Sequence, residues 1–342
     1  MTSKIKSSNG LKDFWVLIKS PPNKDESTSK LAAERNASLT KPPGALGRLE
    51  ELAIWYCAWR QNPNANILSP QVIVFAGNHG VASLGVSAFP QEVTEQMVLN
   101  FEHKGAAINQ LCQVAGAKLN VHSLELEKPT KDFTKEPALS SKEFEESLLV
   151  GWSAVKQETD LLVVGEMGIG NTTSAAVLAC ALFGRAVREG GGRGTGVTDE
   201  GLALKIKVVE QGLERIKEES LDPFELLRQL GGREMVAMVG AIARARALKI
   251  PVILDGFICC ASAAVLEKTK NGLLDHCVAG HLSSEGAHLS ILELLNKKPI
   301  IDLNLRLGEA SGGALAINIM KSALACHNGM ASFEEASVST KV

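Results

Sequence analysis

Six short apolar runs, each ending in glycine or polar residues, alternate with helix-like stretches along this chain of 342 residues. This alternation constrains the fold more than any other feature, because neighbouring parallel strands need a long crossover between them, usually a helix. Right-handed crossovers then stack the helices on both faces of one sheet. We therefore predict an α/β fold with a doubly wound, mainly parallel sheet. The six expected strands are residues 71–76, 118–123, 160–164, 251–254, 274–278 and 299–303.

Helices are expected between these strands and at both ends of the chain. Helical periodicity with capping residues marks residues 91–115, 171–183, 198–217, 233–247 and 284–295. Two helical stretches stand outside the alternation, residues 314–327 and residues 32–60, the latter broken by TKPPG. We expect a partly mobile leader (1–30), a small helical domain (31–66 and 314–342) and a large α/β domain (67–313) carrying the active site. Residues 127–141, with two prolines, predict a surface loop.

Charge and composition narrow the class of partner. The formal net charge is −2 and the Lys and Arg residues are scattered, so the sequence predicts no positively charged patch for binding nucleic acid or a membrane surface. A small-molecule partner is favoured instead. Hydrophobic residues make up 45% but aromatic residues only 4%, which predicts a core of Ala, Val, Ile and Leu, as expected where helices cover a parallel sheet.

The cysteines and the N-terminal region predict a cytoplasmic protein. Seven cysteines occur singly or as the adjacent pair Cys259-Cys260 without CxxC spacing, which is typical of buried thiols in a reducing compartment. The apolar run at residues 14–18 is too short for the core of a signal peptide or for a membrane span.

The first candidate for chemistry is Glu309. Residues 306–310 follow an apolar run that predicts a strand, and they precede a small-residue helix. In open parallel sheets, ligands collect at the carboxyl ends of the strands. Gly308 before the carboxylate and Gly312 and Gly313 after it leave bare backbone for a substrate to approach. Glu309 is therefore a candidate catalytic base.

The richest segment is residues 164–173, VGEMGIGNTT, which predicts a strand end, a glycine turn and a capped helix. Backbone amides at such a helix start can hold a phosphate or another anion. The pattern is neither a dinucleotide fingerprint nor a Walker loop, and a purely structural glycine turn remains an equal alternative. Glu166 would repel an anion, so its carboxylate is more readily aimed at a hydroxyl or an amine.

Three other glycine turns are candidates for substrate contact. Residues 190–196, GGGRGTG, precede a helix that carries Lys205, which suits phosphate binding, although a plain linker is nearly as consistent. Gly256 follows the strand ending at residue 254. Ser283 and Ser284 either cap a helix or contact a ligand, at about even odds.

His79, at the end of the first expected strand, leaves more than one role open. It could be an acid, a base or a metal ligand, but a lone histidine is more often a hydrogen-bonded structural residue. HxxH, HExxH and Cys/His clusters are absent from the sequence, so we expect no metal, and a Ser-His-Asp triad lacks a GxSxG elbow. Two glutamates with glycine turns at strand ends predict an acid–base enzyme acting on a phosphorylated small molecule.

Taken in order, these segments resemble the nicotinate-nucleotide:dimethylbenzimidazole phosphoribosyltransferase family. The resemblance runs from about Leu39 to the last helix and rests on residues 41–50, 78–80, 90–94, 165–173, 254–257 and 305–309. It implies a Rossmann-like sheet with a small helical domain built from both chain termini, and a homodimer. It also implies a reaction in which a benzimidazole nitrogen attacks C1′ of nicotinate mononucleotide, releasing nicotinate and giving α-ribazole 5′-phosphate with inversion.

The resemblance assigns roles to individual residues. Glu309 matches the general base, and Glu166 resembles the second acidic residue, near the ribose or the incoming ring. The ring pocket would be lined by Ser83, Gln91, Met167 and Leu307. The phosphate and ribose contacts would be Gly168, Lys205, Gly256 and Ser283. Neither a metal nor a cofactor is implied.

The chain also departs from the family's pattern. Asn78 stands where many relatives carry Asp, Ala310 replaces a common Gly, and residues 280–288 are a loose match. A related transferase that uses a purine or phenol ring and a non-catalytic nucleotide-binding paralogue are the two alternative functions.

Overall fold

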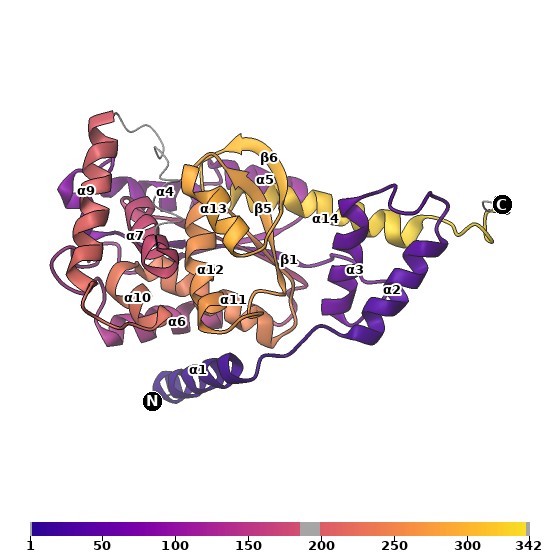
Figure 1. Cartoon of the computed structure of the whole chain (residues 1–342), viewed down its shortest axis with the longest axis horizontal. Coiled ribbons are helices and arrows are strands. Elements are labelled where there is room, and N and C mark those ends of the chain that lie inside the picture. The colour runs from indigo at the N-terminus through magenta and orange to yellow at the C-terminus, as the bar shows by residue number, and fades with distance from the viewer. Residues whose placement is uncertain (1, 185–198, 340–342) are drawn as a thin grey trace.

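One six-stranded sheet organises the computed structural model, which describes residues 2–184 and 199–339, with side chains from residue 10 to 184 and from 200 to 339 (Figure 1). The strand order is β2-β1-β3-β4-β5-β6, and all pairs are parallel. The predicted fold class is therefore confirmed. The strands are β1 (Pro70–Ala76), β2 (Lys118–Ser123), β3 (Leu161–Met167), β4 (Val252–Leu254), β5 (Cys277–Ser283) and β6 (Pro299–Leu305).

The helices cover both faces of this sheet. Along β1, Ile73 and Phe75 join one core cluster whereas Val72 and Val74 join the other, because successive side chains of a strand point to opposite faces. The helices are α1 (Thr2–Lys19), α2 (Glu26–Ser38), α3 (Arg48–Arg60), the 3₁₀ helix η1 (Gly80–Leu84), α4 (Glu92–Glu102), α5 (Ala107–Ala115), α6 (Ser141–Ala154), α7 (Asn171–Phe183), α9 (Asp199–Ile216), α10 (Pro223–Leu230), α11 (Arg233–Ala247), α12 (Phe257–Thr269), α13 (Gly286–Leu294) and α14 (Ser311–Gly329). The first cluster includes buried side chains of α1, α6, α7 and α9 to α13, and the second those of α2, α3, α5 and α14.

Some predicted boundaries were wrong. The segment 274–278 was expected as a strand, but β5 begins at Cys277, after a turn that buries Leu273 and Leu274. The helix expected over residues 91–115 is two helices, because the chain turns at Lys104 with a φ of 61°. Helix α6 was not predicted, although Ser140 and Glu143 form a capping box at its start, a signal readable in the sequence.

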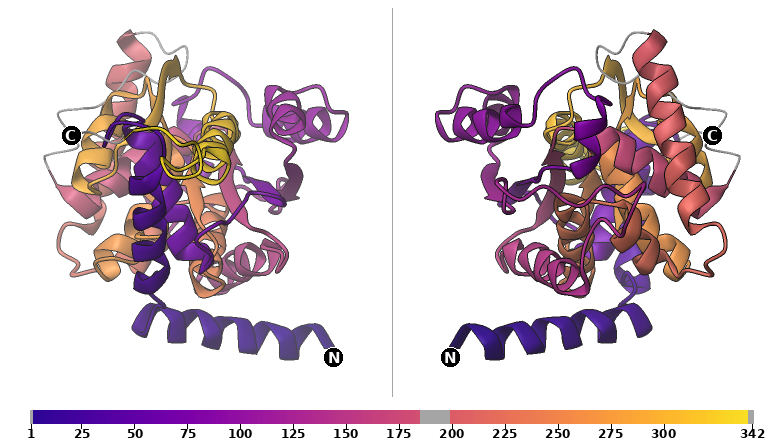
Figure 2. Two further views of the ribbon diagram at one scale, coloured as in Figure 1. Left: turned by 90° about the vertical axis from the view of Figure 1, so that its right-hand side faces the viewer. Right: turned by 90° about the vertical axis from the view of Figure 1, so that its left-hand side faces the viewer.

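Both ends of the chain contribute helices beside the sheet. Helices α2 and α3 lie next to α14 (Figure 1). Leu39 forms a bridge with Ser332, and the Arg35 Nε donates to the carbonyl oxygen of His327 at 2.9 Å. The first residues, expected to be a partly mobile leader, form helix α1, which lies along the outside of the molecule (Figure 2). Its Phe14 ring packs edge-on against Trp152 and Phe224, with centroid distances of 5.9 and 5.6 Å.

None of the described helices combines the length and the apolar character needed to cross a membrane.

Candidate active site

The strand order locates the site. From β1 the chain goes first to β2 at the sheet edge and then to β3 on the other side of β1, so the direction of winding reverses between β1 and β3. Ligands of open α/β sheets bind at the carboxyl ends of the strands at such a point. The turn after β1 carries Asn78 and His79, and the end of β3 carries Glu166.

Glu309 lies in an unusual turn between β6 and α14. Gly308, Glu309 and Ala310 all have left-handed backbone angles, with φ values of 80°, 60° and 63°. A Cβ atom at position 308 would lie 2.5 Å from Glu166 Oε1 and would displace that carboxylate, so both this contact and the left-handed conformation favour glycine there. The turn therefore brings the backbone of the β6–α14 connection directly against the Glu166 carboxylate.

Burial raises the pKa of both glutamates. Glu309 is only 5% exposed, and burial, followed by the negative charge of Asp255, raises its pKa to about 7. Glu166 is buried at the end of β3, where burial and then the charges of Asp255 and Glu234 raise its pKa to about 8. The Asn171 side-chain amide, at the start of α7, donates to Glu166 Oε2 and opposes this shift.

Asp255 follows β4 and lies at the same edge. Its Oδ1 accepts the backbone amide of Gly313 at 2.8 Å and lies 3.6 Å from His281 Nδ1. Burial raises the pKa of Asp255, and His281 and the surrounding amides oppose that rise. The carboxyl ends of β3, β4 and β6 thus place three carboxyl groups in one region.

His79 is a buried, hydrogen-bonded residue. Its Nδ1 lies 2.8 Å from Ser174 Oγ and its Nε2 lies 2.7 Å from Glu234 Oε1. Glu234 Oε2 is packed against Gly77 and Gly232, with no hydrogen-bond partner among the described residues. With both ring nitrogens engaged in this way, the geometry favours the hydrogen-bonded structural role for His79.

The four residues expected to line the ring pocket differ in their environment. Gln91 donates from Nε2 to the His79 carbonyl oxygen at 2.5 Å, and Met167 is half-buried at the end of β3. Ser83, in η1, is exposed and donates to the Gly80 carbonyl oxygen at 2.8 Å. Leu307 is 54% exposed, two residues before Glu309.

The expected phosphate and ribose contacts come from four different elements. Gly168 approaches the Gly77 carbonyl oxygen so closely that a Cβ would lie 2.4 Å from it. Lys205 of α9 donates to Thr172 Oγ1 at 3.1 Å, and burial lowers its pKa while Glu285 opposes the shift. Gly256 faces the His281 ring.

Ser283 stands at the end of β5, and its hydroxyl accepts the Glu285 amide at 3.3 Å. This contact supports the turn before α13, but the N-cap residue of that helix is Glu285 and makes no side-chain cap hydrogen bond, so the capping role expected for Ser283 or Ser284 was wrong. The predicted glycine loop 190–196 lies outside the described residues.

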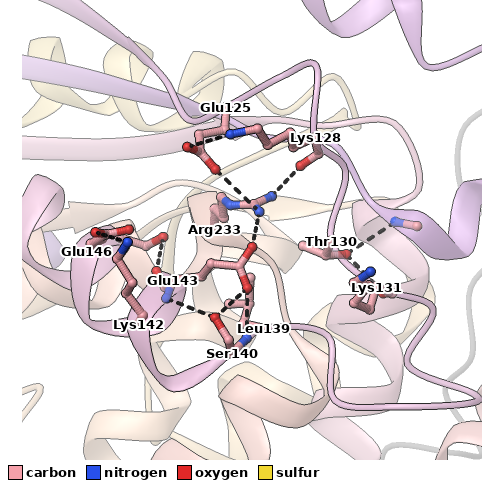
Figure 3. Close-up of polar contacts among 12 residues, drawn as sticks. Glu125, Lys128, Thr130, Lys131, Leu139, Ser140, Lys142, Glu143, Glu146 and Arg233 are labelled. Carbon is pink, nitrogen blue, oxygen red and sulfur yellow. Dashed lines mark hydrogen bonds and ion pairs between the residues drawn. The ribbon is translucent and has the colours of Figure 1, made fainter.

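A buried arginine, Arg233, holds the segment that follows β2 (Figure 3). Arg233 donates to the Lys128 carbonyl oxygen at 2.6 Å and to Glu143 Oε1, and it lies 3.7 Å from Glu125 Oε2. The segment held in this way reaches the turn after β1, because the Thr130 amide donates to the Asn78 carbonyl oxygen at 3.0 Å.

Sequence reasoning gave no role to Arg233, Glu234, Asp255 or His281. Asp255 lies beside Gly256, in a glycine turn that the sequence predicted as a substrate contact, whereas no sequence motif marked Glu234.

The arrangement suits proton transfer at neutral pH. A general base works best when its pKa is near the operating pH, and Glu309 fulfils this condition. Among the described residues, no group of three or more His, Cys, Asp or Glu side chains is arranged to hold a metal ion.

Comparison with known proteins shows similarity over almost the whole chain. A family model described as phosphoribosyltransferase matches residues 21–338. A nicotinate-nucleotide–dimethylbenzimidazole phosphoribosyltransferase of Ruegeria pomeroyi is 60% identical over 329 residues, covering 96% of this chain and 97% of that protein. A protein of the same name from Jannaschia sp. is 58% identical, with 96% and 97% covered. The crystal structure of the Thermus thermophilus protein of that name has a TM-score of 0.86 and 38% identity, covering 93% of this chain and 100% of that one.

Proposed function

The chain belongs to the nicotinate-nucleotide–dimethylbenzimidazole phosphoribosyltransferase family, and on that premise we propose that it transfers the phosphoribosyl group of nicotinate mononucleotide to 5,6-dimethylbenzimidazole. The products are α-ribazole 5′-phosphate and nicotinate. The observation that carries this proposal for the chain itself is the buried Glu309 carboxyl group, with a pKa of about 7, at the carboxyl edge of the sheet.

Glu309 acts as the general base. One nitrogen of the benzimidazole attacks C1′ of the ribose, and the proton on the other nitrogen passes to the Glu309 carboxylate. The bond from C1′ to the pyridinium nitrogen breaks, and its electron pair neutralises the ring, so the leaving nicotinate needs no proton. Attack opposite the β-linked leaving group gives the α product with inversion at C1′.

The neighbouring carboxyl groups favour a cationic substrate. In the ligand-free protein Glu166 has a pKa of about 8 and is mainly protonated at pH 7. A bound pyridinium, or the positive charge that develops at C1′, favours the ionised form of Glu166 by Coulomb attraction in a region shielded from water. Binding of the nucleotide and ionisation of Glu166 therefore support each other.

The remaining site residues supply binding. Met167 and Leu307 offer apolar walls for a flat ring, and Gln91 and Ser83 offer polar contacts. Lys205 provides a compact positive charge for the phosphate. Gly168, Gly256 and Ser283 allow the ribose phosphate to approach the backbone at three strand ends.

The test is an assay of purified protein with nicotinate mononucleotide and a panel of rings, which measures released nicotinate and new nucleoside phosphate. We expect release with 5,6-dimethylbenzimidazole. Release only with purines or phenols would support a transferase for other rings. Binding of the mononucleotide without release with any ring would support a non-catalytic binding protein.

The Glu309→Gln variant tests the base. It keeps the shape and the neutral hydrogen-bonding capacity of the side chain, so we expect unchanged mononucleotide binding and a loss of turnover of about 10²- to 10⁴-fold. Glu145→Gln, the same change at an exposed position of α6, serves as the control. Unchanged turnover of Glu309→Gln would reject the assignment.

We also propose a homodimer in the cytoplasm. Leu289, Leu294 and Leu303 are exposed on α13 and the edge strand β6, a surface suited to a second copy of the chain. Light scattering after gel filtration gives the mass, and a monomeric mass would reject the dimer.

Burial raises the pKa of the Cys112 and Cys277 thiols to about 12, which suits stable thiols in a reducing compartment. Fractionation of cells tests the location.

A further inference from the structure

The first turn of α14 receives its cap from another part of the fold. Backbone amides at a helix start have no partner within the helix. The N-cap residue of α14, Ala310, makes no side-chain cap hydrogen bond. Instead, Asp255 reaches in from the end of β4 and accepts the Gly313 amide at 2.8 Å, and the neighbouring amides of Ala310 and Gly312 also act to lower the pKa of its carboxyl group.

These amides directly follow Glu309. The turn formed by Gly308, Glu309 and Ala310 has three successive left-handed residues, two of which are not glycine. Such conformations persist only where the surrounding structure holds them. On one side the Glu309 amide donates to the Glu166 carbonyl oxygen at 3.2 Å, and on the other side Asp255 holds the amides of α14.

We propose that Asp255 is the positioning residue for Glu309: its carboxylate grips the backbone immediately after the base and fixes the left-handed turn from which the Glu309 side chain reaches the incoming ring. This inference rests on the proposed function, because it concerns the same base and the same transfer. Asp255 itself touches neither substrate nor reacting atoms and acts through the backbone of α14.

Asp255 also acts on Glu309 through its charge. Its negative charge is the main electrostatic cause that adds to burial in raising the pKa of Glu309. The other titratable groups around Asp255 are His281 on β5, Glu166 on β3, and Cys259 and Cys260 on α12. His281 is 3.6 Å from Asp255 and offsets this negative charge when protonated. Glu234, at the start of α11, adds its charge at Glu166.

The Asp255→Asn variant separates these contributions. Its side-chain oxygen still accepts hydrogen bonds from the amides of α14, but the negative charge is lost and these hydrogen bonds become weaker. We expect kcat to fall by about 10- to 100-fold, as for a small misplacement of a catalytic group, while the KM for nicotinate mononucleotide stays nearly constant. The acid limb of the pH profile should move to lower pH by about one unit, because an ionised neighbour no longer opposes ionisation of Glu309.

Asp275→Asn is the matched control, since Asp275 is an exposed aspartate that precedes β5 at the opposite edge of the sheet. It should change neither kcat nor the pH profile. A merely structural role of Asp255 would lower the yield or the melting temperature without moving the acid limb. An Asp255→Asn enzyme with wild-type kcat and an unmoved acid limb would overturn the inference.

A titration independent of turnover completes the test. The Glu309 carboxyl carbon, labelled with ¹³C and assigned by comparison with Glu309→Gln, should titrate well above an ordinary glutamate in the wild-type protein and lower in Asp255→Asn. If Asp255→Asn does not fold, Asp255→Ser removes the same charge and replaces it in the test. An ordinary glutamate pKa for Glu309 in the wild-type protein would overturn the inference. Absence of nicotinate release by the wild type, in contrast, would refute the proposed function, which keeps the two failures distinct.

Discussion

The backbone amide of Glu309 donates to the backbone carbonyl oxygen of Glu166 at 3.2 Å. Glu309 follows strand β6 and Glu166 lies at the end of strand β3, and β4 and β5 separate these two strands in the sheet. This hydrogen bond therefore draws the connection after the edge strand back towards the middle of the sheet. As a result, two carboxyl groups with raised pKa values share one region although neither strand is the other's neighbour.

The rate should depend on the ionised form of Glu309. Since its pKa is about 7, we expect kcat/KM for the benzimidazole, measured with saturating nicotinate mononucleotide so that Glu166 is already ionised, to be nearly constant above pH 8 and to fall about tenfold per pH unit well below pH 7. Initial rates in overlapping buffers measure this profile. A rate that stays constant down to pH 5 would contradict Glu309 as the group that must be ionised.

Replacing Glu166 should stabilise the protein most at alkaline pH. Its pKa rises from 4.5 to about 8 on folding, so the folded state holds its proton more tightly than the unfolded state. That contribution is fully present below pH 4.5 and is lost as the pH rises through 8. We expect Glu166→Gln to gain about 2–4 kcal/mol in unfolding free energy at pH 8 and little at pH 4.5.

Urea unfolding at the two pH values measures this difference. Glu145→Gln is again the exposed control, and equal gains for Glu166→Gln at both pH values would contradict the buried, protonated carboxyl group.

A methyl group at position 308 should damage the site more than the fold. Gly308→Ala strains a residue with a φ of 80° and places Cβ 2.5 Å from Glu166 Oε1. We expect a loss of at least about 1 kcal/mol in stability and a fall in kcat as Glu166 and Glu309 are displaced.

Gly184→Ala provides the control for backbone strain. Its φ is 72°, but no residue of the described ranges lies within 4 Å of the added Cβ. Calorimetry and initial rates on both variants separate strain from contact: similar kcat values for the two variants would argue against the Gly308–Glu166 contact.

Lys205 should act on binding of the mononucleotide. Removing a charged hydrogen-bond donor from a phosphate costs about 1.5–3 kcal/mol, so Lys205→Ala should raise the KM for nicotinate mononucleotide by about 10- to 100-fold. Lys207→Ala removes an exposed lysine from the same helix and should leave KM unchanged. Equal mononucleotide affinity of the two variants, measured by calorimetric titration, would rule out the phosphate contact.

Arg233 should contribute mainly to stability. Arg233→Ala leaves the Lys128 carbonyl and the partly buried Glu143 carboxylate without this donor, which should cost about 2–3 kcal/mol. Lys142→Ala, which removes an exposed ion pair with Glu146 in the same region, should cost less than about 0.5 kcal/mol (Figure 3). Chemical unfolding compares the two, and hydrogen exchange should report faster opening of residues 125–140 in Arg233→Ala alone.

The alternation of apolar runs was sufficient to predict the sheet and several helices. Helices α7 and α11 have the predicted bounds, because the Gly-Asn and Gly-Gly-Arg sequences mark their starts. The predicted bounds of strand β5 were wrong, since the apolar Leu273 and Leu274 pack in a turn and show no periodicity that distinguishes them from strand residues.

The residues of the site could be predicted only in part from the sequence, for a related reason. Glycine turns revealed the strand ends and their two glutamates. The contacts that hold them are tertiary: Asp255 bonds an amide 58 positions away, and His79 bonds a carboxylate 155 positions away. No local pattern encodes such pairs, so Glu234 and the capping role of Asp255 required the structure.

The pairing of early and late segments has a consequence during protein synthesis. Helices α2 and α3 leave the ribosome early, directly after α1, yet the carbonyl groups that bind Arg35 belong to residues 327, 328 and 330, and the bridge partner of Leu39 is Ser332. A nascent chain interrupted before residue 311 would expose the apolar sides of these two helices and would still lack the first turn of α14. Chaperones would therefore find their target at the beginning of the polypeptide, although translation stopped near its end.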